Sequence, residues 1–307
     1  MQTETLKKNV RRSFIKYWDL YILLIPVLAY FIIFKYFPMY GLQIAFKSYS
    51  LRLGFSKSPW VGLDHFIRFF KSPNFGQIMY NTISISAVTL VFTYPFPIIL
   101  ALLLNEMHNA TYKKVVQTVT YAPHFLSTVV VIGMMVSFLS PSTGIINHII
   151  KLFGREPVYF ITKPEYFKPL YVISEIWKNT GWNSIIFLSA LANVDVSLYE
   201  ASKIDGANRW QQLLNITLPS IIPTSIIILI LNCGKVMNVG FEKVFLMQTD
   251  LTLGVSEVIS TYVYKQGILN TQFSYSTAVG FFNSVINFAL LVVVNYVAKK
   301  VSDVSLW

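Results

Sequence analysis

The 307-residue sequence has few charged residues and only one cysteine. Charged residues make up 13% of the chain, about half the share that is usual in a soluble domain, whereas 54% of the residues are hydrophobic. The single cysteine, Cys233, excludes a disulfide framework and a zinc site built from cysteines. The four histidines are too far apart to give a metal-ligand spacing; they are His65, His108, His124 and His148. Composition therefore places the chain among membrane proteins and predicts no metal site.

Sequence features of an ATPase or of another enzyme are also absent. The chain contains no Gly-x-x-x-x-Gly-Lys-Ser/Thr phosphate loop, so any ATP must be bound by another protein. An enzyme site within the membrane would need acidic residues, histidines or a nucleophile within reach of one another. Glu175 and Glu106 are the candidates, and no histidine–aspartate or paired-carboxylate arrangement accompanies them. The sequence therefore favours a protein with no catalytic residues and no cofactor of its own.

The net charge of +11 could reflect either nucleic-acid binding or membrane topology. No basic run is interleaved with aromatic residues, as a nucleic-acid groove would require, so we expect no nucleic-acid partner. Lysine and arginine instead gather at the cytoplasmic ends of membrane helices. Five basic residues precede the first apolar stretch, which lacks a cleavage site and is expected to stay as the first span; they are Lys7, Lys8, Arg11, Arg12 and Lys16.

Six segments are long and apolar enough to cross a bilayer, which requires about 20 mainly apolar residues. They are residues 20–41, 78–104, 115–139, 170–193, 218–239 and 277–298. No polar stretch is long enough to build a soluble core, so we expect a single all-α transmembrane domain over residues 1–307. A short helix is also expected at the outer surface over residues 255–265.

The distribution of lysine and arginine predicts the orientation of these spans. The outer loops carry a similar number of basic residues but are longer, so the basic density is higher on the side of the N-terminus, which we expect to be cytoplasmic. The cytoplasmic parts are then the tail of residues 1–18, the loop around residue 113, the loop of residues 195–217 and the C-terminus.

The loop of residues 195–217, between the fourth and fifth spans, is polar and rich in small residues. Residues 198–204 can form about two helical turns, and residues 207–215 can form a second helix. Gly206 permits a turn between them that a side chain would obstruct. Asp205 is the expected N-cap of the second helix.

The small residues of this loop would let another backbone approach closely; they are Ala201, Ser202, Gly206 and Ala207. Glu200 adds a charge for a basic partner or an exposed amide. Trp210, Leu213 and Leu214 are expected to anchor the loop against the membrane helices. On these residues alone, a docking surface and a plain connector remain equally open.

The run from Glu200 to Pro219 closely resembles the EAA signature of ABC-importer permeases: Glu-Ala-Ala, then Asp-Gly-Ala, then Ile-x-Leu-Pro. The residues that match are Glu200, Ala201, Asp205, Gly206, Ala207, Leu218 and Pro219. Ser202 stands where the motif has its third residue, an alanine, so one small residue replaces another. In that family the loop is a coupling helix that fits a cleft of the ATPase subunit. The resemblance therefore implies that Glu200, Ala201, Ser202, Asp205, Gly206 and Ala207 dock an ATPase.

Further residues resemble the carbohydrate-uptake, maltose-type branch of these permeases. They are Asn81 and Thr82 at the start of the second span and residues 177–191 before the loop. Residues 18–40 look like the LplB-type permeases for oligo- or polysaccharides. The resemblance implies a bacterial cell-membrane complex with a second homologous permease, two ATP-binding subunits that hold ATP and magnesium, an extracytoplasmic solute-binding protein and an oligosaccharide cargo.

Polar residues within the last three spans are candidates for the substrate pathway. They are Trp177, Lys178, Asn179, Trp182, Asn183, Asn232, Lys235, Asn238, Asn283 and Asn287. Tryptophan faces stack on sugar rings, asparagine amides bind hydroxyl groups, and two lysines at similar depth could attract an acidic sugar such as a uronate. Structural roles are the alternative, because Glu175 and Lys178 are spaced to pair on one helix and asparagines often bond between helices.

Two other functions remain open at this point. The same architecture could import a non-sugar solute, such as an amino acid or phosphate. A channel or carrier that works without ATP is the second alternative, although it would not need a docking loop.

Overall fold

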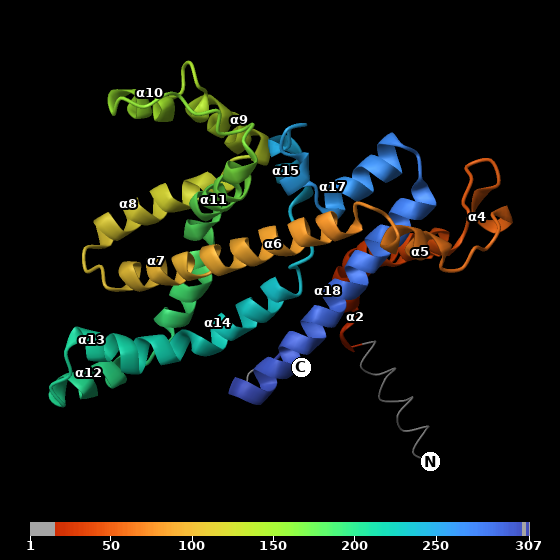
Figure 1. The fold of residues 1–307 in the computed structure, drawn as a ribbon. Helices are drawn as coiled ribbons and strands as arrows, with labels where there is room; N and C mark the ends of the chain where they lie inside the picture. The colour runs from red at the N-terminus through yellow and green to blue at the C-terminus, as the bar shows by residue number, and fades with distance from the viewer. Residues whose placement is uncertain (1–15, 303–304, 307) are drawn as a thin grey trace, which may run out of the picture.

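The computed structural model describes residues 16–302 and 305–306, so most of the predicted tail of residues 1–18 lies outside the described residues. Over this part of the chain the structure is helical (Figure 1), with no strand beyond an isolated bridge between Lys47 and Trp60. The predicted all-α class is confirmed.

Four helical segments are long and apolar enough to cross a membrane, and the number rises to six if each of two bent pairs is one span. The four are Trp18–Phe46, Phe75–Asn105, Arg209–Cys233 and Phe273–Ser302. The bent pairs are Ala110–Phe125 with Thr128–Leu139, and Pro164–Ala192 with Val196–Ile204. The described residues reach the predicted number of six spans only if each bent pair is counted as one span.

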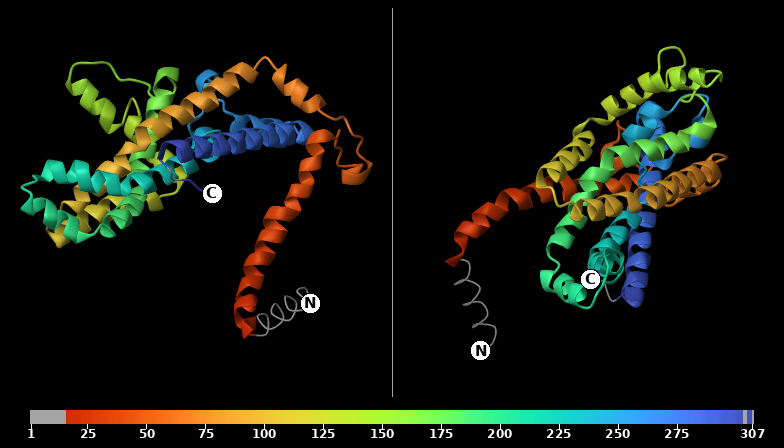
Figure 2. Two further views of the ribbon diagram at one scale, coloured as in Figure 1. Left: turned by 90° about the horizontal axis from the view of Figure 1, so that it is seen from below. Right: turned by 90° about the vertical axis from the view of Figure 1, so that its left-hand side faces the viewer.

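Most of the first span stands apart from the remaining helices (Figure 2), and only its last segment, residues 40–46, packs against the helix of residues 273–302. The span consists of α2 (Trp18–Phe31), η1 (Ile32–Tyr36), α3 (Phe37–Met39) and η2 (Tyr40–Phe46). No residue of its most apolar window is buried within the chain, and Figure 2 shows α2 standing apart from the helical body. Its apolar side chains are therefore left for lipid or for another subunit.

The second span is a bent helix that follows two short helices, α4 (Gly54–Lys57) and α5 (Asp64–Phe70). It consists of α6 (Phe75–Thr93) and α7 (Pro95–Asn105). Pro95 has no backbone N–H to continue the helix, so the bend falls at Tyr94. The Tyr94 hydroxyl donates to the Ser225 backbone carbonyl at 2.6 Å and ties the bend to the fifth span.

The third span is broken, so the prediction of one continuous helix over residues 115–139 is wrong. It consists of α8 (Ala110–Tyr121), η3 (Ala122–Phe125) and α9 (Thr128–Leu139), with an angle of 100° at the break. Pro123 removes a backbone donor, and the backbone of Leu126 and Ser127 is extended. The Ser127 side chain then caps α9 by accepting from the Val130 backbone N–H.

Helix α11 (Pro164–Ala192) lies at the centre of the bundle, after the short helix α10 (Ile145–Leu152) (Figure 1). It packs against α6, α7, α8 and α14. A Cβ atom at Gly181 would overlap the backbone of Thr120, so glycine at this position allows the end of α8 to touch α11. This contact fixes one side of the break in the third span.

The loop after α11 contains α12 (Val196–Ile204), α13 (Arg209–Gln212) and η4 (Leu213–Thr217) and leads into α14 (Leu218–Cys233). The predicted span over residues 218–239 is longer than this helix, because the chain leaves helical geometry after Cys233. The connection to α18 (Phe273–Ser302) holds α15 (Phe241–Met247), α16 (Leu253–Ser256), α17 (Ile259–Tyr264) and η5 (Lys265–Leu269). The predicted helix over residues 255–265 is thus divided, and its residues Val258, Ile259 and Tyr262 are buried.

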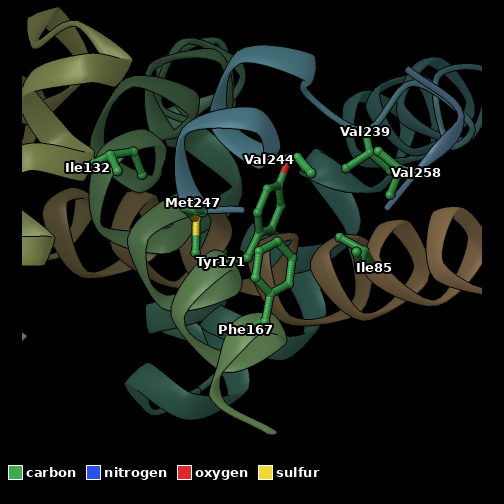
Figure 3. Packing of buried hydrophobic residues seen from close by; sticks show 8 residues of the cluster. All are labelled: Ile85, Ile132, Phe167, Tyr171, Val239, Val244, Met247 and Val258. Carbon is green, nitrogen blue, oxygen red and sulfur yellow. The ribbon is translucent and has the colours of Figure 1, made fainter. Parts of the chain in front are cut away.

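A core of buried hydrophobic residues joins α6, α9, α11 and α15. Its members, shown in Figure 3, are Ile85, Ile132, Phe167, Tyr171, Val239, Val244, Met247 and Val258. Four of them, Ile85, Ile132, Tyr171 and Val239, also line a cavity between the same elements. The core therefore supports the wall of that cavity.

Candidate functional site

A polar cavity of about 600 Å³ lies between α6, α9, α11 and α15, and the non-helical stretch after α14 closes one side. Charged and amide side chains line it, although the surrounding helices are mainly apolar. Ionisable groups inside a membrane domain are costly and usually functional. This cavity is therefore the first candidate site.

Helix α11 supplies one polar wall of the cavity by its helical repeat. Tyr171, Glu175, Asn179 and Asn183 follow one another at intervals of four residues, Lys178 lies three residues after Glu175, and all five line the cavity. The pattern explains why these polar residues occur inside an otherwise apolar span.

Glu175 forms an ion pair across the cavity wall with Lys243 of α15. The Lys243 Nζ atom lies 2.7 Å from Oε2 of Glu175, and the side chains are 9% and 28% exposed for Lys243 and Glu175. Lys243 also donates to the Tyr171 backbone carbonyl at 2.8 Å and lies over the Tyr171 ring at 4.2 Å. Glu175 thus pairs with Lys243 rather than with Lys178, the partner that its helical spacing suggested.

Hydrogen bonds extend this ion pair to the break in the third span. The Asn179 amide donates to Oε1 of Glu175, which leaves the Asn179 Oδ1 atom 3.0 Å from Nδ1 of His124 in η3. Because Oδ1 only accepts, His124 donates with its Nδ1–H. The His124 ring also stacks on Trp182, with ring centroids 4.6 Å apart.

Lys178 and Lys235 have no such neutralising partner. The two ion pairs found among the described residues are Lys243–Glu175 and Lys265–Glu257. Lys178 donates to the Thr128 hydroxyl at 3.4 Å, and Lys235 is exposed on the cavity wall. Both ammonium groups therefore remain available to an anion that enters the cavity.

The structure brings together six of the ten candidate residues of the substrate pathway. Those that line the cavity are Lys178, Asn179, Asn183, Asn232, Lys235 and Asn238. Trp177 instead lines a separate apolar pocket of about 340 Å³. Asn283 and Asn287 lie behind the wall, where both amides donate to Oδ1 of Asn238 at 2.9 and 3.0 Å. Trp182 packs on His124 and Phe125 outside the lining.

Several lining residues were absent from the predicted set. Ser86, Thr89 and Thr93 recur at helical spacing on α6, a signal that the sequence carried. The Thr89 hydroxyl is buried and has no hydrogen-bond partner among the described residues, so it is free to bond a molecule in the cavity. His124 and Lys243 carried no such signal, because they lie outside the helical repeats of α6 and α11 and reach the cavity only through the fold.

No group of three histidine, cysteine or acidic residues in the described chain could hold a metal ion.

The second candidate site is the surface of α12 and α13, which Figure 1 shows at the end of α11 and α14. Asp195 caps α12 by accepting from the Ser197 backbone N–H at 2.9 Å, and this bond holds the pKa of the Asp195 carboxyl below its ordinary value. Helix α12 ends in a Schellman motif. Ala207 N–H donates to the Ser202 carbonyl and Gly206 N–H to that of Lys203.

Gly206 has a φ angle of +78°, which a residue with a side chain rarely adopts, so the predicted need for glycine at the turn is confirmed. The predicted N-cap is wrong. Asp205 ends α12, whereas Asn208 caps α13 in a capping box with Gln211, with bonds of 3.0 and 2.7 Å. Asn208 takes the role because the turn at Gly206 places it, rather than Asp205, immediately before the helix.

Polar bonds within the loop connect its two helices. The Gln212 amide donates to the Ser202 hydroxyl at 3.0 Å, and the Tyr199 and Thr217 hydroxyls are 3.0 Å apart. Thr217 is almost fully buried. The loop is therefore held to the start of α14 as a small structural unit.

The six predicted docking residues lie together in this unit. Glu200, Ala201, Asp205 and Gly206 are exposed, and Ser202 and Ala207 are half-buried. Ile204 and Trp210 are 87% and 70% exposed. Of the three residues expected to anchor the loop, Trp210 and Leu214 are exposed, so the expectation is wrong for them, whereas Leu213 is half-buried. The hydrogen bonds described above also hold the loop. An exposed tryptophan and isoleucine beside small residues form an apolar surface that lacks a partner in the described chain.

Comparison with known proteins supplies a family match over residues 94–303, to the family described as binding-protein-dependent transport system inner membrane component. The chain is 47% identical over 288 residues to protein LplB of Bacillus subtilis (strain 168), covering 94% of this chain and 91% of LplB. It is 42% identical over 301 residues to the polygalacturonan/rhamnogalacturonan transport system permease protein YteP of the same organism, covering 98% and 94%.

The fold is also similar to that of a chain in crystal structures of a bacterial ABC transporter involved in the import of the acidic polysaccharide alginate. The TM-score is 0.88 at 40% sequence identity, with 96% of this chain and 99% of the other covered. One of these structures contains an alginate pentasaccharide-bound periplasmic protein.

Proposed function

Because the chain belongs to the family of binding-protein-dependent transport system inner membrane components, we propose that it is the membrane-spanning subunit of an ABC importer for acidic oligosaccharides. Family membership makes it a non-catalytic, multi-pass permease of the inner membrane. Separate subunits of such a transporter handle ATP. The acidic cargo and the roles of individual residues are the proposed part.

The observation that carries the proposed cargo is the presence of two unneutralised lysines in a cavity lined by amides. Lys178 and Lys235 face a space of about 600 Å³, within the range of roughly 300–1,000 Å³ that is usual for small-molecule sites. Asparagine amides offer donors and acceptors to sugar hydroxyls, and ammonium groups bind carboxylates. Two similar proteins support an acidic sugar: a transporter involved in the import of the acidic polysaccharide alginate and a permease named for polygalacturonan/rhamnogalacturonan transport.

The loop around α12 and α13 is the proposed site of coupling to ATP hydrolysis. Its exposed face combines small residues, which permit close approach, with Ile204 and Trp210, which would be covered by a partner. We assign docking of an ATPase cleft to Glu200, Ala201, Ser202, Asp205, Gly206 and Ala207. Closure of the ATPase dimer would move this loop, and α11 and α14 on either side would transmit the motion to the cavity that they help to form.

The proposed complex contains a second homologous permease, two ATP-binding subunits with ATP and magnesium, and a solute-binding protein outside the membrane. The unburied first span and the exposed apolar face of the loop agree with an assembly of several subunits. In this arrangement both termini of the chain and the loop of residues 195–217 are cytoplasmic, in a bacterial cell membrane.

ATP hydrolysis by the purified complex tests the proposed cargo. Binding protein loaded with trigalacturonate should stimulate hydrolysis, whereas the neutral methyl ester of the same trisaccharide should stimulate it much less. Equal stimulation by the two forms would remove the acidic-cargo proposal, and stimulation by an unrelated amino acid or phosphate alone would indicate a non-sugar importer.

A further inference from the structure

One of the three cavity lysines differs from the others because a carboxylate of the same chain neutralises it. Lys243 lies 2.7 Å from Glu175, whereas Lys178 and Lys235 are in neither of the ion pairs of the described chain. Lys178 and Lys235 line the same cavity as Lys243. The cavity therefore presents two free ammonium groups where its composition would give three.

Hydrogen bonds hold the Glu175 carboxylate in this position. Oε2 accepts from Lys243, and Oε1 accepts from the Asn179 amide, which itself accepts from His124. Both carboxylate oxygens are thus engaged, and Glu175 forms no ion pair with Lys178 within the described residues. The carboxylate is thus committed to Lys243.

The remaining titratable groups of the cavity do not replace Glu175. Glu242 lies in the first turn of α15 and is exposed, and it forms no ion pair within the described residues. His124 donates with Nδ1–H to a neutral amide. Glu175 is therefore the carboxylate that touches a cavity lysine.

We propose that Glu175 is a specificity-determining residue that limits the positive charge offered to the cargo. By occupying Lys243 it leaves Lys178 and Lys235 to bind carboxylates, so an acidic oligosaccharide is attracted but can still be released. This inference rests on the proposed function, since it assumes an acidic cargo. It differs from a purely structural role for the ion pair, in which only the packing of α15 on α11 would matter.

Opposite effects of the two single substitutions are expected. Glu175→Gln keeps the shape and frees Lys243, so trigalacturonate should bind about fivefold tighter and leave more slowly. Lys243→Met leaves the Glu175 carboxylate without its counter-ion, so trigalacturonate should bind about tenfold more weakly. The double variant Glu175→Gln with Lys243→Met restores the original charge balance and should return the affinity to near that of the unchanged protein.

The experiment is calorimetric titration of the purified, detergent-solubilised complex with trigalacturonate and with its methyl ester, at two salt concentrations. The ester reports shape and hydroxyl contacts without charge. Glu257→Gln is the matched control, because it breaks the other ion pair, Glu257 to Lys265 at 2.9 Å, which lies outside the cavity. Gel filtration of each variant checks that the complex is assembled.

The outcomes separate this inference from the proposed function. If the unchanged complex binds acid and ester equally, the acidic cargo is wrong. If it prefers the acid but both single variants weaken acid and ester alike, and the double variant stays weak, the ion pair is structural and the inference is overturned. Where one single variant does not assemble, the other decides: a shift in its preference for acid over ester in the stated direction supports the inference, and an unchanged preference overturns it.

Discussion

At the scale of single residues, the cavity separates side chains that hold the structure from side chains that are free to bind. Asn238 is occupied by Asn283 and Asn287, and Glu175 by Lys243 and Asn179. Within the described part of the chain, the Lys178 ammonium group has one long contact, with the Thr128 hydroxyl, and Lys235 is in no ion pair. This distinction, rather than polarity alone, selects the residues that we assign to the cargo.

Replacing Lys235 by methionine should reduce acidic cargo transport selectively. The ammonium group is lost while the stem length is kept, so the concentration of trigalacturonate for half-maximal uptake should rise about tenfold, with little change for a neutral trisaccharide. Uptake of labelled sugars into proteoliposomes measures both. Lys151→Met on α10, an exposed lysine outside the cavity, serves as control. The assignment would be contradicted if the Lys235 variant took up the acidic sugar as well as the unchanged protein does.

Sequence could predict part of the residue assignment and not the rest. Helical spacing places Glu175, Lys178 and Asn179 on one face and Trp177 on another, so the separation of Trp177 from the cavity was accessible from the pattern. The partner of Glu175 was not accessible, because Lys243 reaches it through the fold of a segment far along the chain. Tertiary pairing of this kind has no local signature.

At the scale of elements, the turn at Gly206 is the part of the loop that the sequence predicted best. The positive φ angle that glycine permits ends α12, and only the N-cap of the following helix was assigned to the wrong residue. The Gln211 side chain, three residues after Asn208, was the available capping-box signal. In the third span, Pro123 and Ser127 were likewise visible stop and start signals within a stretch that apolar composition alone made continuous.

A bulky side chain at Gly206 should abolish ATP-driven uptake and leave ATP hydrolysis uncoupled. A Cβ atom at this position meets nothing within 4 Å in the chain, so Gly206→Trp would obstruct a docked partner more than its own loop. Gly154→Trp is the matched control, because Gly154 also has a positive φ angle, +74°, and open space. Both variants carry similar backbone strain, so a difference between them reports the surface. Uptake by the Gly206 variant at the level of the control would contradict the docking role.

The close contact between α8 and α11 should require that residue 181 has no Cβ atom. Gly181→Ala would press a methyl group into the Thr120 backbone and should destabilise the protein by about 1–3 kcal/mol. Gly133→Ala in α9 meets nothing within 4 Å and should be neutral or stabilising by up to about 1 kcal/mol. Thermal unfolding in detergent compares the two. An equal melting temperature for both variants would show that the break in the third span is not fixed by this contact.

At the scale of the whole molecule, the chain leaves apolar surfaces uncovered that a larger complex would bury. Its first span buries none of its apolar window, the loop at α12 and α13 presents an exposed tryptophan, and the chain carries no phosphate-binding loop. Each of these features is consistent with a permease that works within a larger complex. The family match over residues 94–303 covers the loop and the cavity lining from His124 onward, whereas the lining residues of α6 precede it.

The most direct measurement is uptake of labelled trigalacturonate by proteoliposomes that contain the complete complex and its binding protein, with ATP supplied or withheld on the ATPase side. We predict that uptake requires both ATP and the binding protein. We also predict that trigalacturonate methyl ester is a poor competitor of labelled trigalacturonate. Uptake that persists without ATP would contradict the central claim and would indicate a channel or carrier.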